Sequence, residues 1–68
     1  MVSETDLVGR RVRVTGILPN DPAPLKVGEE GVVTGAPGAG TPFAQIVVTW
    51  DSGRSLLLLP DDPFEVLP

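Results

Sequence analysis

The sequence has no cysteine, no histidine and no tyrosine among its 68 residues. Without cysteine a disulfide framework is excluded, and without both cysteine and histidine so are the common zinc sites. The same absences remove most of the side chains that act as general acids, bases or nucleophiles, which leaves Lys26 as the one plausible amine nucleophile. We therefore expect a protein that is not an enzyme and that needs no cofactor and no metal.

Basic residues are also scarce, because five Lys and Arg stand against nine Asp and Glu, for a formal net charge of −4. This balance disfavours nucleic acid as a partner, since such binding usually rests on a concentration of positive charge. No apolar run approaches the roughly 20 residues needed to span a bilayer, and the polar, acidic start MVSETD does not resemble a secretory signal. We expect a cytoplasmic protein without a membrane partner.

Glycine and proline are abundant, with eight of each. They argue against long helices, because each is costly inside a helix. Val, Leu, Ile and Phe together make up 22 of the 68 residues, well above the level typical of disordered chains. The composition therefore indicates one small globular domain with many turns, whose core contributes little net stability on its own.

Between the Gly and Pro positions, short segments alternate apolar and polar residues, as half-buried strands do. We predict strands at residues 10–18, 32–35, 43–50, 54–59 and 64–67, with Trp50 in the core. Residues 19–24 (PNDPAP) predict a stiff loop, residues 35–42 a mobile glycine-rich hairpin loop, residues 51–53 a tight turn and residues 60–63 a corner. Residues 1–8 read as an N-terminal arm or a single helical turn capped by Ser3.

Five short strands with these connections predict an all-β fold, a small five-stranded SH3-like barrel over residues 9–68. Closure into a barrel also removes the two exposed edges that an open sheet would leave. A barrel of this size has little room for the cavity of roughly 300 Å³ or more that small-molecule sites occupy.

A series of motifs in fixed order carries a resemblance to a known family: residues 9–14 (GRRVRV), 21–22 (DP), 28–33 (GEEGVV), 48–53 (VTWDSG), 56–60 (LLLLP) and 62–66 (DPFEV). The chain resembles a family of short bacterial and bacteriophage proteins catalogued as a domain of unknown function. The similarity runs from about Gly9 to Leu67. It implies the SH3-like fold and brings no catalytic residues, since none are established for that family.

The basic residues are candidates for a binding surface. Arg11 and Arg13 share the outward face of the first strand, and Lys26 and Arg54 could lie on the same side of a closed barrel. This pattern is compatible with a solvated strand face and with a patch that binds an acidic partner.

Four consecutive leucines, residues 56–59, break the alternation of a strand. If Leu56 and Leu58 fill the core, Leu57 and Leu59 face outward. Either the corner and the last strand cover them, or a second chain does, which makes a homo-oligomer the alternative.

Three functions follow from these features. The first is a non-enzymatic SH3-like module that binds another protein through its first loop, its glycine-rich loop and its arginine face. The second is a nucleic-acid-associated accessory protein. The third is a self-assembling structural component of a phage or bacterial complex, suggested by Leu57 and Leu59.

Overall fold

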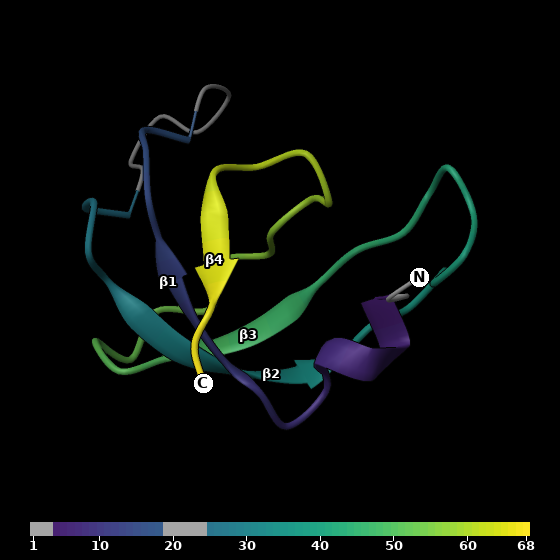
Figure 1. The fold of residues 1–68 in the computed structure, drawn as a ribbon, viewed down its shortest axis with the longest axis horizontal. Coiled ribbons are helices and arrows are strands. Elements are labelled where there is room, and N and C mark those ends of the chain that lie inside the picture. The colour runs from purple at the N-terminus through teal and green to yellow at the C-terminus, as the bar shows by residue number, and fades with distance from the viewer. Residues whose placement is uncertain (1–3, 19–24) are drawn as a thin grey trace.

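The computed structural model describes residues 4–18 and 25–68, and it is a small strand-rich domain with almost no helix. The predicted proline-rich loop and the Ser3 cap lie outside the described residues. One 3₁₀ turn precedes four strands (Figure 1): η1 Glu4–Leu7, β1 Arg11–Val14, β2 Glu30–Gly35, β3 Val47–Trp50 and β4 Phe64–Val66.

The four strands of the described ranges form one open antiparallel sheet in the order β3-β2-β1-β4. Strand β2 pairs with β1 on one side and with β3 on the other. Strand β4 returns to the free side of β1, so the first and last strands are neighbours (Figure 1). A bulge between Val33 and Gly35 shifts the register of β2 against β3. The turn η1 is tied to this sheet, because Gly9 donates its N–H to Val33 O at 2.8 Å and Leu7 packs against the core.

One face of the sheet holds the core, and the alternation in the sequence predicted which side chains do so. Val12, Val14, Val48 and Trp50 are buried, whereas Arg11 before Val12 and Thr49 between Val48 and Trp50 are exposed. The inward placement of Trp50 is thus confirmed. The rest of the buried cluster comes from β2 and from the connecting segments: Leu18, Leu25, Val33, Ile46 and Leu58.

The predicted fourth strand, residues 54–59, is not a strand in the structure. It makes one isolated bridge, in which Ile46 and Leu58 exchange both backbone hydrogen bonds at 2.8 and 2.9 Å. Before this bridge, Leu56 O accepts the indole N–H of Trp50 at 2.9 Å. The segment makes no further ladder pair with β3 in the described part of the chain. The sheet of the described residues therefore has four strands where five were predicted, and closure into a barrel is not shown.

The glycine-rich loop extends further along the chain than predicted. The strand that follows begins at Val47 and not at Phe43, because the preceding residues fold into successive turns. Gln45 N–H reaches back to Pro37 O at 2.9 Å, and the hydroxyl of Thr41 donates to Gly38 O at 2.6 Å. Gly38 adopts φ of 72°, a left-handed conformation that favours glycine. The loop is consequently held by its own hydrogen bonds.

At Gly31 in β2, the absence of a side chain lets β3 approach closely. A Cβ atom there would lie 2.6 Å from Thr49 O, 2.8 Å from a methyl carbon of Val48 and 2.9 Å from the Trp50 Cα. Two of these three atoms belong to backbone, which cannot move without disturbing the β2–β3 pairing. In the same strand, a Cβ at Gly35 would meet only Val47, at an ordinary 3.7 Å.

This difference predicts effects of different size for two alanine substitutions in β2. Gly31→Ala should lower the free energy of unfolding by about 1–3 kcal/mol, the usual cost of overpacking. Gly35→Ala should change it by no more than about 0.5 kcal/mol. Urea unfolding followed by the fluorescence of Trp50 measures both, and equal effects of the two substitutions would contradict the close approach at Gly31.

Candidate functional site

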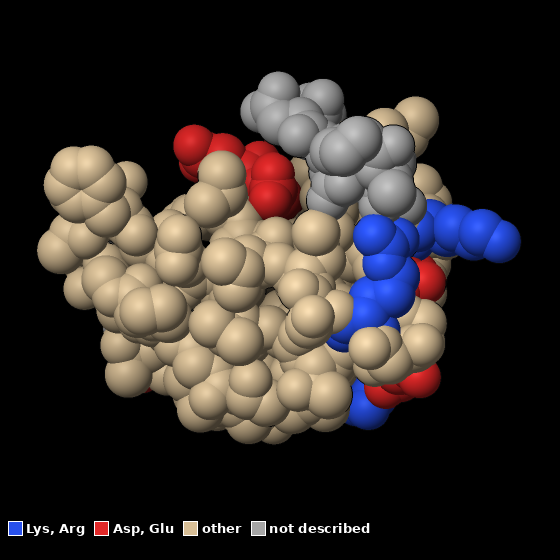
Figure 2. Space-filling model, turned by 180° about the vertical axis from the view of Figure 1, so that it is seen from behind, with Lys and Arg blue, Asp and Glu red and all other residues tan. Residues whose placement is uncertain are grey.

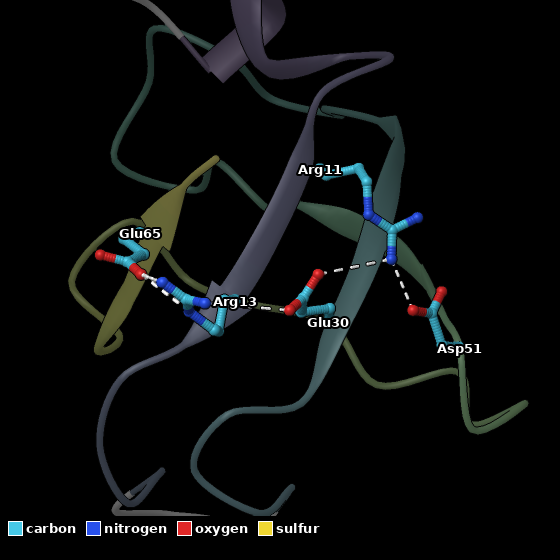
Figure 3. A network of polar contacts seen from close by, with 5 residues as sticks. All are labelled: Arg11, Arg13, Glu30, Asp51 and Glu65. Carbon is cyan, nitrogen blue, oxygen red and sulfur yellow. Dashed lines mark hydrogen bonds and ion pairs between the residues drawn. The ribbon is translucent and has the colours of Figure 1, made fainter. Parts of the chain in front are cut away.

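Charged side chains form a network across the face of the sheet opposite the core (Figure 3). Since Val12 and Val14 point inward, Arg11 and Arg13 of β1 point outward. The register puts Arg13 opposite Glu30 of β2 on one side and opposite Glu65 of β4 on the other. The sheet thereby brings carboxylates to both sides of the arginines.

Each arginine of the network contacts two carboxylates. Arg11 is 2.5 Å from Asp51, which follows β3, and 3.7 Å from Glu30. Arg13 is 3.9 Å from Glu30 and donates two hydrogen bonds to one oxygen of Glu65. Those hydrogen bonds, together with the charge of Glu65, raise the pKa of the Arg13 guanidinium, so Arg13 keeps its charge throughout the accessible pH range.

The network changes the interpretation of the arginine face. Arg11 and Arg13 do share one face, but three carboxylates surround two guanidinium groups, so the local charge is negative by one. All five side chains are partly exposed, and exposed ion pairs of this kind contribute little each. The arrangement links neighbouring strands through several weak ion pairs.

Lys26 and Arg54 are not among the five residues of this network. Lys26 lies exposed in the segment between β1 and β2, and Arg54 is exposed just after the turn at residues 51–53. That turn forms as predicted, with Gly53 at φ of 87° and its N–H donated to Trp50 O at 2.9 Å. Of the four basic candidates, the network therefore brings together Arg11 and Arg13.

A second type of surface is uncharged. Residues 35–50 and 55–60 contain no Lys, Arg, Asp or Glu. Seen from behind, most of the molecule is formed by uncharged side chains, with basic groups gathered at one side and acidic groups both near the top and beside the basic ones (Figure 2). Within residues 55–60, Leu57 is 44% exposed and Leu59 50%, as the alternation predicted, whereas Leu58 is fully buried.

Phe43 is the functional candidate that the sequence analysis missed. Its side chain is 84% exposed, more than any other large apolar side chain among the described residues. Thr41 Oγ accepts the Phe43 N–H at 3.2 Å, while Ala44, next to it, is buried. The only signal in the sequence was an aromatic residue directly after Pro42, which also suited the start of a strand.

No protein-family model, curated protein or solved structure matches this chain. The resemblance to a bacterial and bacteriophage family therefore stays a prediction. Within residues 4–18 and 25–68, no three metal-ligating side chains are grouped so that they could hold a metal ion. The described part of the chain also has no helix with the length and apolar character to cross a membrane.

The shared position of Glu30 between the two arginines leads to a test of the network. Glu30→Gln keeps the size of the side chain and removes both ion pairs, so it should lower the free energy of unfolding by less than about 1 kcal/mol. The loss should shrink as salt is raised toward about 1 M, because salt screens exposed charges. Urea unfolding at low and high salt measures this, with Glu4→Gln as the matched control; a loss that salt leaves unchanged argues against an ionic origin.

Proposed function

We propose that this chain is a non-enzymatic module that binds another protein through its glycine-rich loop, with Phe43 as the anchor. The observation that carries the proposal is the 84% exposure of Phe43 on a loop that is held by its own hydrogen bonds. Aromatic side chains contribute strongly when they are buried in a partner's pocket. An aromatic side chain that is exposed to water does not stabilise the isolated fold.

The order within the loop supports binding because it lowers the entropy that association costs. A loop that is already held in place loses less conformational freedom when a partner docks on it. Hydrogen bonds join Gln45 to Pro37 and Thr41 to Gly38, on either side of the loop's tip. A Cβ atom added at Gly38 would lie 2.9 Å from Phe43 O, so the backbone of Gly38 packs closely against that of Phe43. This close packing further restricts the backbone that presents the Phe43 side chain.

We also propose that the fold is an SH3-like barrel in which residues 54–59 take the place of a fifth strand. The Ile46–Leu58 bridge puts this segment beside the start of β3, on the side away from β2. The spatial order is then this segment, β3, β2, β1 and β4, as in a meander whose last strand returns to the first. Hydrogen exchange at Ile46 and Leu58 amides reports how firmly the segment is held.

The proposal that the protein is not an enzyme is supported by its composition. It has no His, Cys or Tyr, which are among the side chains that most often carry acid–base and nucleophilic catalysis. Lys26 is exposed, whereas a catalytic lysine is usually activated by an apolar pocket or by a neighbouring cation. A cytoplasmic location is part of the same proposal, since small secreted domains usually depend on disulfides and this chain has no cysteine.

Binding through Phe43 predicts a specific loss. Immobilised wild-type protein should retain a protein from a lysate of its source cells, and Phe43→Ala should weaken that binding at least about tenfold, as for a typical anchor residue. Ile17→Ala, which shortens another exposed apolar side chain, is the matched control and should retain the partner. Unchanged retention by Phe43→Ala would refute the proposed site.

Nucleic acid is the alternative partner, and the structure makes it less favourable. Phosphate contacts need available cations, yet Arg11 and Arg13 are both engaged by carboxylates. We therefore expect no retention of the protein on DNA or RNA at low ionic strength. Retention that falls steeply as salt is added would support the nucleic-acid function instead.

A further inference from the structure

Strand β4 lies at an edge of the sheet, and half of its main-chain groups point away from β1. The N–H of Leu67 donates to Arg11 O at 2.8 Å, which puts the main-chain groups of Leu67, and of Glu65 two residues earlier, on the β1 side. The N–H and C=O groups of Phe64 and Val66 therefore point to the other side. Within residues 4–18 and 25–68, no group is hydrogen-bonded to these four. They are the donors and acceptors of an unpaired strand edge.

A row of alternating charges crosses the sheet and ends at this edge. The register places Glu30, Arg13 and Glu65 side by side on β2, β1 and β4. Their charges are negative, positive and negative, and no further described strand pairs with β4 beyond Glu65. Opposite charges that face each other across neighbouring strands favour their pairing. A cation in the next position would therefore continue the row.

Glu65 can bind such a cation while it keeps its contact with Arg13. Both hydrogen bonds from Arg13 go to the same oxygen of Glu65, Oε1. The other carboxylate oxygen points away from Arg13 (Figure 3). The Glu65 side chain is 45% exposed, and an ionised carboxylate accepts hydrogen bonds on both of its oxygens. One added cation would also neutralise the network, whose own charge is negative by one.

The core side of β4 favours apolar neighbours. Phe64 lies opposite Val14 and Val66 lies opposite Val12, so these side chains share the core side of the sheet. Phe64 is partly buried against the core, whereas Val66 is 37% exposed. Apolar residues on both sides of the added cation would cover what these two side chains leave exposed.

We propose that β4 binds an extended segment of a partner protein as an added antiparallel strand. The segment has Lys or Arg opposite Glu65 and apolar residues opposite Phe64 and Val66. Residues 12–14 of β1 (VRV) already pair with the other side of β4 in this pattern. In strand addition, main-chain hydrogen bonds supply affinity and alternate side chains supply specificity.

A second copy of this chain fits the edge less well than a basic segment does. Two β4 strands paired antiparallel through Phe64 and Val66 would put Glu65 of one copy opposite Glu65 of the other. Like charges directly opposite each other destabilise a strand pair. The net charge of −4 adds to the repulsion between copies. The edge is separate from the Phe43 site, and neither inference depends on the other.

Synthetic peptides test the main-chain pairing. The probe is acetyl-TVRVT-amide, whose arginine should lie opposite Glu65, and its binding to the full chain is measured by NMR titration. Phe64 and Val66 amides should exchange with solvent more slowly in the complex. Methylation of the amide nitrogen of the second valine, which donates to Phe64 O in this register, should weaken binding at least about tenfold.

Methylation of the arginine amide nitrogen is the matched control. In the same register this N–H points away from β4, so its methylation should change the affinity by no more than about twofold. Equal losses for the two methylated peptides would overturn the proposed pairing. So would the absence of binding at about 1 mM of the unmodified peptide, or protection of the Phe64 and Val66 amides by self-association without peptide.

Charge substitution tests the role of Glu65. Glu65→Gln should weaken binding of TVRVT about two- to fivefold, as expected for one exposed cross-strand charge pair. Asp51→Asn is the matched control, because it removes a network carboxylate that contacts Arg11 and lies away from β4. It should leave the affinity unchanged, and the fluorescence of Trp50 verifies that both variants are folded.

A reversed preference gives a readout that does not depend on stability. Wild type should bind TVRVT more tightly than TVEVT, whereas Glu65→Lys should prefer TVEVT. The ratio of the two affinities is taken within each protein, so a smaller folded fraction cancels. The same ratio for wild type and Glu65→Lys would overturn the assignment of Glu65 as the residue that selects a basic segment.

Discussion

The burial of Trp50 is the interaction on which the rest of the structure depends. Its side chain is 1% exposed, and its indole N–H donates to Leu56 O at 2.9 Å. A buried aromatic of this size is a large share of the core that a 68-residue chain can build. Glycine at position 31 is needed beside it, because the two strands approach too closely there for any side chain.

The same hydrogen bond lies next to the exposed leucines. It joins the Trp50 indole to Leu56 O, two residues before Leu58, which forms the bridge to Ile46. Leu58 is buried, and Leu57 and Leu59 on either side of it face outward. The same short segment therefore contributes to the core and to the exposed apolar surface.

The charged network and the exposed apolar side chains differ in whether they have partners within the chain. On the network face, Arg11 and Arg13 are matched by carboxylates from β2, from β4 and from the turn after β3 (Figure 3). This face is largely neutralised within the chain. Phe43 and the outward leucines are apolar and exposed, so they are the better candidates for intermolecular contact. Seen from behind, the molecule is formed mostly by uncharged side chains (Figure 2).

The sequence by itself determined which side chains of a segment face the core and which face solvent. The alternation around Val12, Val48 and Leu58 placed the core side chains correctly, because a strand has a period of two. The tight turn at Gly53 followed from local chemistry in the same way. Only the tertiary structure decided which segments pair, and in which register. That information joins residues far apart in the chain, such as Arg13 with Glu65 or Arg11 with Asp51, and no local pattern encodes it. For this reason the arginines looked like a free basic face, residues 54–59 looked like a strand, and Phe43 looked like the start of one.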